Sequence, residues 1–308
     1  MTKRVPELSL KAFTHGDEAQ RRDFSRTLFK GLQDYGFFTL ADHNVSAALL
    51  DEAYGLAEQL FALPEAVKRR YAAGMRGYTP FGVEHAKDSD KPDLKEFWQI
   101  GHDPDPAAPE PFAPNVWPAE LPAVQPVFTR LFAALNETGQ ILLRALAPNL
   151  GLAEDYFDDK VRHGASLLRV LHYPPVASGM TPGAVRSAAH EDINFITILV
   201  AARGAGLQLL DRDGTWLPVE TEPRNLIVDS GDMLQRLTNG VIPSTTHRVV
   251  NPDGAANVSR YSMPFFMHPT NATPLDVLPG CVGEGKRYPD ITAGEFLNER
   301  LKAIGLAG

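Results

Sequence analysis

The stretch that decides the fold reads Ala189-His190-Glu191-Asp192-Ile193-Asn194-Phe195-Ile196-Thr197-Ile198-Leu199. Its β-branched and aromatic residues, which follow a polar start, are typical of a strand that enters a core. Side chains two residues apart on a strand point to the same face, so His190 and Asp192 share a face and Glu191 points away. A role for Glu191 as a metal ligand is the less favoured alternative.

A second histidine, His247, lies in another β-rich segment, Ser244–Val250. Two imidazoles and one carboxylate that leave one side of a metal open are the ligand set suited to non-haem Fe(II) and oxygen. Thirteen residues beyond His247, Arg260 and Ser262 repeat the two-residue spacing. A guanidinium beside a hydroxyl is well equipped to bind a carboxylate. Each motif is common by chance, but their order on strand-like segments predicts an iron oxygenase with an anionic co-substrate or substrate.

The composition limits the classes of protein to consider. The chain has 308 residues, of which 44% are hydrophobic and 22% charged, and a net charge of −8. This charge argues against a general nucleic-acid-binding surface, and no apolar run is long enough to span a bilayer. The polar first residues predict no signal peptide, and the single cysteine, Cys281, fits a reducing compartment. We expect a cytoplasmic protein without nucleic-acid or membrane partners; its oligomeric state is open.

We expect a single catalytic unit in four consecutive parts. They are a mostly helical part that ends in a proline-rich segment (1–120), a long helix (121–160), a β-rich core with the metal site (161–270), and a C-terminal extension with a helix (271–308). The spacing of apolar residues and the capping residues predict the helices, which are 17–34, 46–60, 64–71, 123–147 and 293–304.

Short strands separated by turn residues predict a β-sandwich or jelly-roll barrel for the core. These strands are 167–173, 195–200, 207–210, 216–219, 226–228, 247–250 and 261–267, and a further short strand is expected at 37–40. Asp211–Gly214 and Asn239–Gly240 have the composition of hairpin turns. A regular hairpin at Asn239–Gly240 would place Asp232 opposite His247, near the metal. The favoured interpretation is that Asp232 only accepts backbone donors in a turn.

Several blocks of sequence, in a fixed order, resemble the isopenicillin N synthase-like branch of the Fe(II)/2-oxoglutarate-dependent dioxygenases. In the N-terminal part they are Tyr35–Phe38, Asp42–Val45, Phe61–Pro64, Gly77–Gly82 and Asp93–Trp98. In the catalytic half they are Leu171–Pro175, His190–Asp192, Gly206–Leu209, Gly214–Trp216, Gly231–Leu234, Thr238–Gly240 and His247–Val249. The resemblance covers nearly the whole chain. One departure, Asp-His-Asn at residues 42–44 where the family usually has Asn-His-Gly, touches a turn rather than the chemistry.

The resemblance implies a mainly β fold with flanking α-helices, built on a double-stranded β-helix (jelly roll). It implies that His190, Asp192 and His247 are the catalytic Fe(II) ligands. The activity implied is oxidative decarboxylation of 2-oxoglutarate to succinate and CO2, coupled through O2 to hydroxylation or a related oxidation of a small-molecule substrate.

The same resemblance implies a site for the co-substrate. 2-Oxoglutarate would chelate the iron and place its distal carboxylate on Arg260, with hydrogen bonds from Ser262 and Tyr173. Isopenicillin N synthase itself uses no 2-oxoglutarate, so a 2-oxoglutarate-independent Fe(II) oxidase or cyclase is the alternative. A non-enzymatic metal-binding or small-molecule-binding protein is disfavoured because all three ligands are present.

The sequence does not name the primary substrate. Five aromatic residues are candidates either for the substrate pocket or for the ordinary core, since ligand sites are mostly apolar and aromatic. They are Phe195, Phe265, Phe266, Tyr78 and Trp98.

Overall fold

The computed structural model describes residues 5–85, 91–106, 108, 112–177, 182–203, 206–252 and 257–303. In chain order its strands are β1 (Glu7–Ser9), β2 (Phe37–Ala41), β3 (Ala72–Ala73), β4 (Arg76–Thr79), β5 (Glu96–Gly101), β6 (Leu167–Tyr173), β7 (Ser187–His190), β8 (Ile196–Arg203), β9 (Leu207–Leu210), β10 (Trp216–Pro218), β11 (Leu226–Ser230), β12 (His247–Val249) and β13 (Arg260–Met267). Its α-helices are α1 (Leu10–Thr14), α2 (Glu18–Tyr35), α3 (Ala47–Ala62), α4 (Glu65–Lys68), α5 (Val124–Leu146), α6 (Asp158–Arg162), α7 (Asp232–Leu237) and α8 (Ala293–Ala303).

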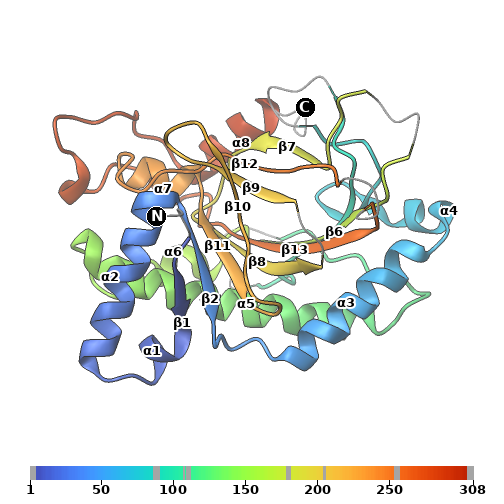
Figure 1. Cartoon of the computed structure of the whole chain (residues 1–308), viewed down its shortest axis with the longest axis horizontal. Coiled ribbons are helices and arrows are strands. Elements are labelled where there is room, and N and C mark those ends of the chain that lie inside the picture. The colour runs from blue at the N-terminus through green and yellow to red at the C-terminus, as the bar shows by residue number, and fades with distance from the viewer. Residues whose placement is uncertain are drawn as a thin grey trace.

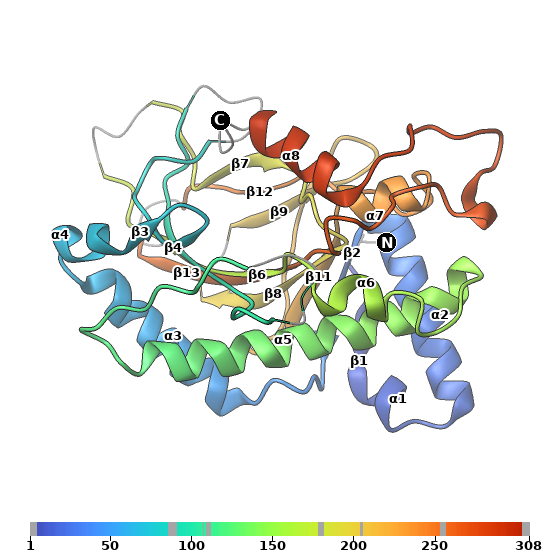
Figure 2. The same cartoon turned by 180° about the vertical axis from the view of Figure 1, so that it is seen from behind.

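The strands form two sheets, and the larger one has helices on its outer side (Figures 1 and 2). The larger sheet has the order β1-β2-β11-β8-β13-β6-β5-β4-β3, and the smaller has the order β10-β9-β12-β7. Strands β6 to β13 divide evenly, since β6, β8, β11 and β13 join the larger sheet and the other four form the smaller one. This distribution, with antiparallel pairing among the strands from β6 to β13, confirms the double-stranded β-helix with flanking helices.

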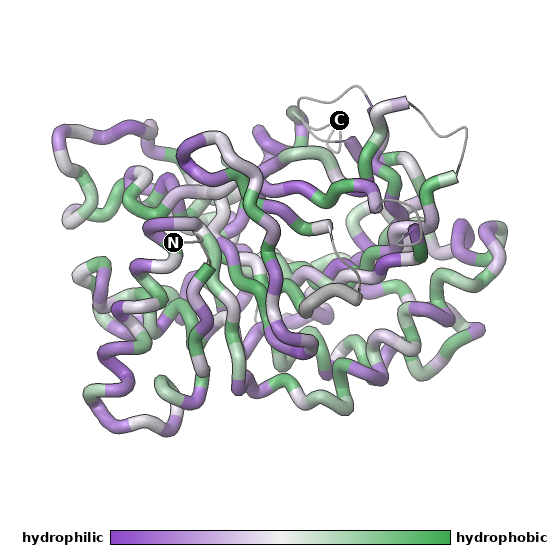
Figure 3. Tube along the Cα trace, in the orientation of Figure 1, coloured by the Kyte–Doolittle hydropathy of each residue, from purple (hydrophilic) through white to green (hydrophobic). Residues whose placement is uncertain are grey.

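The long helices begin and end where the sequence predicts. Asp17 caps α2 by accepting a hydrogen bond from the backbone of Gln20, and Gly36 ends that helix with a left-handed φ of 69°. Ser46 caps α3 through Leu49. Hydrophilic and hydrophobic residues alternate along α2 (Figure 3), as expected of a helix with one buried face. None of the helices in the described ranges is long and apolar enough to cross a membrane.

The N-terminal part contains more strand than the sequence predicts. Only β2 was expected there, whereas β1, β3, β4 and β5 also join the larger sheet. All six residues of β5 are buried, polar Glu96 and Gln99 included, so the strand lacks the alternation that reveals a half-buried strand. Because β5 pairs with β6, the N-terminal part extends the same sheet as the core.

One of the two predicted hairpins is wrong. Asp211–Gly214 does connect β9 to β10, with Leu210 paired to Trp216. By contrast, Asn239 and Gly240, with φ of 53° and 80°, follow helix α7. Strands β11 and β12 on either side belong to different sheets. The left-handed conformation that suits Asn-Gly to a hairpin turn also suits it to the end of a helix.

Two hydrophobic clusters divide the interior. The larger cluster lies between the helices and the nine-stranded sheet, and α3 and α5 pack there against β13. The smaller cluster lies between the two sheets and includes Phe37, Leu171, Leu199, Leu209 and Val249. Side chains alternate along each strand, so the same strands supply the core on one face and the wall of a pocket on the other.

Candidate metal centre and ligand pocket

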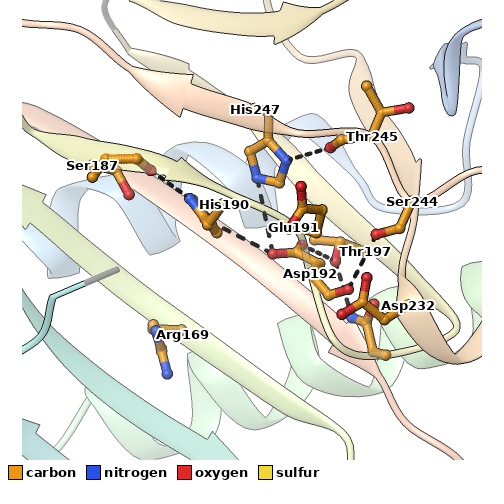
Figure 4. Close-up of polar contacts among 12 residues, drawn as sticks. Arg169, Ser187, His190, Glu191, Asp192, Thr197, Asp232, Ser244, Thr245 and His247 are labelled. Carbon is orange, nitrogen blue, oxygen red and sulfur yellow. Dashed lines mark hydrogen bonds and ion pairs between the residues drawn. The ribbon is translucent and has the colours of Figure 1, made fainter. Parts of the chain in front are cut away.

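His190, Asp192 and His247 converge at one end of the smaller sheet (Figure 4). The two histidines are directly paired across the antiparallel strands β7 and β12, and their ring centroids lie 4.4 Å apart. Asp192 follows β7, and its Oδ1 lies 3.8 Å from Nε2 of His190 and 3.9 Å from Nε2 of His247. Ligand atoms that share one ion at about 2 Å lie no more than about 4 Å apart, so these separations fit a common metal.

A bulge sets the direction of His190. Between the pairs His190–His247 and Ser187–Val249, β7 advances three residues while β12 advances two. This extra residue changes the alternation, so that Ser187 and His190 both line the pocket. Strand periodicity alone would have placed them on opposite faces.

Backbone carbonyls orient both imidazoles. Nδ1 of His190 lies 2.7 Å from the carbonyl oxygen of Ala188, and Nδ1 of His247 lies 3.2 Å from that of Thr245. A carbonyl can only accept, so each Nδ1 carries the proton and each Nε2 presents its lone pair to the shared space. The Thr197 hydroxyl donates to Oδ2 of Asp192, which leaves Oδ1 to face the histidines.

The electrostatics of the cluster suit a cation. Burial, together with the neighbouring His190, lowers the pKa of His247 to about 4, so this imidazole is neutral near pH 7. Burial by itself would raise the pKa of Asp192, but His247, His190 and the Thr197 hydroxyl outweigh it and lower the pKa below its ordinary value. Two neutral imidazoles and one carboxylate are the form in which these side chains bind a metal. The residues present therefore fit an Fe(II) ion.

A second carboxyl group, on Asp229 of β11, also lines the pocket. Burial and the neighbouring Asp192 raise the pKa of Asp229 well above its ordinary value. Both effects favour the protonated form of this carboxyl group over a second anion beside Asp192. The sequence did not indicate Asp229, because nothing in the order of residues along β11 shows which of its side chains lies beside the triad.

Glu191 lies outside the pocket, as strand alternation predicts. Its carboxylate accepts a hydrogen bond from Thr246 and lies 4.0 Å from Arg300 of α8. Asp232 also pairs with Arg300, at 2.9 Å, and its backbone N–H donates to the carbonyl of Asp192 at 2.7 Å. Asp232 thus fixes the backbone at Asp192, although no hairpin forms there. No sequence signal indicated Arg300, which joins from the far C-terminal helix.

The three residues expected to bind a carboxylate line the same pocket as the triad. In the antiparallel pairing of β13 with β6, Arg260 lies opposite Tyr173 and Ser262 lies opposite Leu171. The Arg260 guanidinium is 1% exposed and lies 5.1 Å from the centroid of the Tyr173 ring. Its Nε and Nη1 have no hydrogen-bond partner among the described residues. A buried guanidinium that faces a pocket with two N–H donors unpaired calls for an anionic ligand.

Of the five aromatic candidates, Phe266 lines the pocket and the other four belong to the core on the far side of the sheet. Phe265 and Phe266 are neighbours on β13 and therefore point to opposite faces. Tyr78 and Trp98 pack in the N-terminal extension of the sheet, and Phe195 packs edge-on against Phe157.

Charged side chains that the sequence did not predict form the wall of the pocket beside Phe266. Arg169 of β6 and Lys95 both line the pocket. Glu84 lies 3.0 Å from Arg169 and 2.7 Å from Lys95, and Asp93 lies 2.8 Å from Lys95. Two cations thus face two carboxylates. Burial would raise the pKa of Glu84, but Arg169 and Lys95 outweigh it and hold the pKa below its ordinary value, so the carboxylate is ionised.

Comparisons with known proteins agree with this geometry. Residues 164–269 match the model of the 2OG-Fe(II) oxygenase superfamily, and residues 5–120 match that of the N-terminal domain described as non-haem dioxygenase in morphine synthesis. The 2-oxoglutarate-Fe(II) type oxidoreductase ppzD of Metarhizium majus is 31% identical over 97% of this chain and 95% of its own length.

Solved structures extend the likeness to the fold. A putative 2OG-Fe(II) oxygenase family protein from Caulobacter crescentus is 43% identical, with a TM-score of 0.88, and the match covers 98% of this chain and 100% of that one. A full-length Neurospora crassa protein in complex with alpha-KG is 29% identical, with a TM-score of 0.87 over 97% of this chain and 96% of that one.

The chain belongs to the Fe(II)/2-oxoglutarate-dependent oxygenase superfamily. It is an oxidoreductase that uses Fe(II) and 2-oxoglutarate, and its His-Asp-His cluster agrees with the iron chemistry of that family. The 2-oxoglutarate-independent oxidase and the non-enzymatic binding protein are thereby set aside in favour of the oxygenase.

Proposed function

We propose that His190, Asp192 and His247 hold the Fe(II) ion, and that Arg260, with Ser262 and Tyr173, holds the distal carboxylate of 2-oxoglutarate. Bound Fe(II) supplies the site at which 2-oxoglutarate and O2 react to give succinate, CO2 and the oxidation of a second substrate. The protein supplies orientation: carbonyl oxygens fix both imidazoles, and the pocket places the guanidinium on the same side of the sheet as the triad.

The observation that carries this assignment is that Arg260, in the pocket of the triad, has no carboxylate partner among the described residues. Its side chain is buried, and two of its N–H donors have no partner in the described residues. A carboxylate arriving there would form charge-assisted hydrogen bonds that only an arginine can offer as a fork. Ser262, on the same face of β13, is also buried and lines the pocket, so its hydroxyl can donate to the same group.

We further propose that the second substrate is a small, uncharged molecule with hydrogen-bond acceptors. It would lie near the wall formed by Phe266, Arg169 and Lys95, where Glu84 and Asp93 already balance both cations. The pocket opens to solvent, which gives a small molecule access beside 2-oxoglutarate. Structures of the same Neurospora crassa protein with alpha-KG and thymine, and with alpha-KG and 5-formyluracil, support a small planar substrate of this kind.

The chain would act as one catalytic unit, because its N-terminal strands β3, β4 and β5 continue the core sheet and β5 supplies buried residues next to the charged wall. We propose a cytoplasmic location and no nucleic-acid partner, on the basis of the single cysteine and the net charge of −8.

The test is succinate formation from 2-oxoglutarate by anaerobically reconstituted protein after exposure to O2. We expect the activity to require added Fe(II), to disappear on chelation and to be lost in His247→Ala, since two ligands bind iron less firmly than three. Candidate substrates that are neutral heterocycles should stimulate turnover, whereas their carboxylated analogues should not. Full activity of His247→Ala would refute the metal assignment, and stimulation by the carboxylated analogues alone would refute the substrate class.

A further inference from the structure

A second arginine is buried at the carboxylate-binding end of the pocket. Arg186 is 2% exposed, and the residue after it, Ser187, lines the pocket together with Arg260. Its Nη2 donates to the carbonyl of Val258, two residues before Arg260 on the same chain segment. Its backbone N–H donates to the side chain of Asn251 at 3.0 Å. The side chain of Arg186 is thus tied to the backbone that leads into Arg260, although Arg186 itself does not line the pocket.

Among the described residues, neither arginine has a carboxylate partner. In the described parts of the chain, no ion pair includes Arg186 or Arg260, and Nε of each lacks a hydrogen-bond partner. Burial lowers the pKa of Arg186, and the charge of Arg260 lowers it further. An uncompensated buried charge is expensive, and two of them at one end of a pocket are more so. An anionic ligand would relieve both.

We propose that Arg186 is a second positioning residue for the co-substrate, which raises the positive potential behind Arg260 and thereby selects an oxo-acid with a distal carboxylate. The proposal rests on the placement of 2-oxoglutarate described above. Arg260 would make the direct contact, and Arg186 would act through the field of its charge and by holding the backbone from which Arg260 projects.

A purely structural role makes a different prediction. If Arg186 only ties β7 to the start of β13 through the carbonyl of Val258, its loss would loosen the whole pocket. Binding of every oxo-acid would then weaken together. If its charge matters, the loss falls on acids that carry a distal carboxylate and spares those that do not.

The experiment is anaerobic calorimetric titration of the Fe(II)-loaded protein with 2-oxoglutarate and with 2-oxobutanoate, which lacks the distal carboxylate. Arg186→Met should weaken 2-oxoglutarate binding about tenfold and change 2-oxobutanoate binding less than about twofold, while Arg186→Lys should stay within about threefold of the wild type for both. Arg186→Gln, which can still donate to the Val258 carbonyl, replaces Arg186→Met if the latter does not fold. Arg130→Met, on the exposed surface of α5, is the matched control.

The titrations separate the inference about Arg186 from the assignment of the co-substrate site. Equal weakening of both acids, or unchanged 2-oxoglutarate binding in Arg186→Gln, would overturn the proposal for Arg186. Arg260→Met belongs in the same series. If it also leaves 2-oxoglutarate binding unchanged, the assignment of the co-substrate site fails; if it weakens binding while the Arg186 variants do not, only the inference about Arg186 fails.

Discussion

The two ends of the pocket hold buried cations in opposite electrostatic situations. At the end formed by β6 and β13, Arg260 has no carboxylate partner in the described residues, and Arg186 behind it has none either. At the end formed by Phe266, Arg169 and Lys95 have carboxylates at 3.0 Å or less. The difference indicates the charge of each ligand: an anion completes the first end, whereas the second end is neutral without one.

Removal of a carboxylate from the end that contains Arg169 and Lys95 should have the largest effect on the free energy of unfolding. Glu84→Gln leaves Arg169 and Lys95 with one carboxylate between them, and removal of one partner from a buried ion pair costs about 3–5 kcal/mol. We expect this loss in the free energy of unfolding measured by urea denaturation. Glu18→Gln, which removes an exposed partner of Arg22, should leave stability unchanged.

The Glu84→Gln protein that still folds also tests the difference between the two ends. Its end with Arg169 and Lys95 would carry a net positive charge, so carboxylated analogues of the substrate should begin to bind there. If Glu84→Gln unfolds no more easily than the wild type, the wall is not the tightly compensated network that the distances indicate.

Removing the uncompensated charge should act on the co-substrate alone. Arg260→Met deletes a charge-assisted pair worth about 2–3 kcal/mol, so the KM for 2-oxoglutarate should rise on the order of 100-fold. The KM for the second substrate should change little, because that ligand lies at the other end. Succinate formation at varied 2-oxoglutarate concentrations measures the effect. A rise in both constants by the same factor would contradict the separation of the two ends.

An ion pair outside the pocket should have the smallest effect. Arg300 of α8 pairs with Asp232 at 2.9 Å, but its side chain is 24% exposed, so the pair is partly screened. Arg300→Met should reduce the free energy of unfolding by about 1 kcal/mol or less and leave the KM for 2-oxoglutarate within about twofold. A tenfold rise in that constant would show that α8 takes part in ligand binding.

The sequence predicted the parts of the site that depend on local spacing. His190 and His247 share one pocket because the antiparallel pairing of β7 and β12 brings them together, and Asp192 joins them from the segment after β7. Strand alternation places Arg260 and Ser262 on the same face of β13. The bulge between Ser187 and His190 could not be predicted, because bulges are set by the partner strand rather than by the sequence of one strand.

The end of the pocket that contains Arg169 and Lys95 escaped prediction for a different reason. Its charged residues come from β6 and from the segment that leads into β5, and each pairs with a residue distant in sequence, as Arg169 does with Glu84. A charged residue in such a segment normally predicts solvent exposure. The hairpin expected at Asn239–Gly240 failed because helix α7 intervenes, which no periodicity indicated in so short a segment.

A crystal structure of the protein with 2-oxoglutarate and Mn(II), a redox-inactive substitute for Fe(II) under these conditions, tests the central comparison most directly. We expect a metal at about 2.2 Å from Nε2 of His190 and His247 and Oδ1 of Asp192, with the distal carboxylate on Arg260. A distal carboxylate bound instead by Arg169 and Lys95 would contradict it, because the compensated end would then be the one that takes the anion.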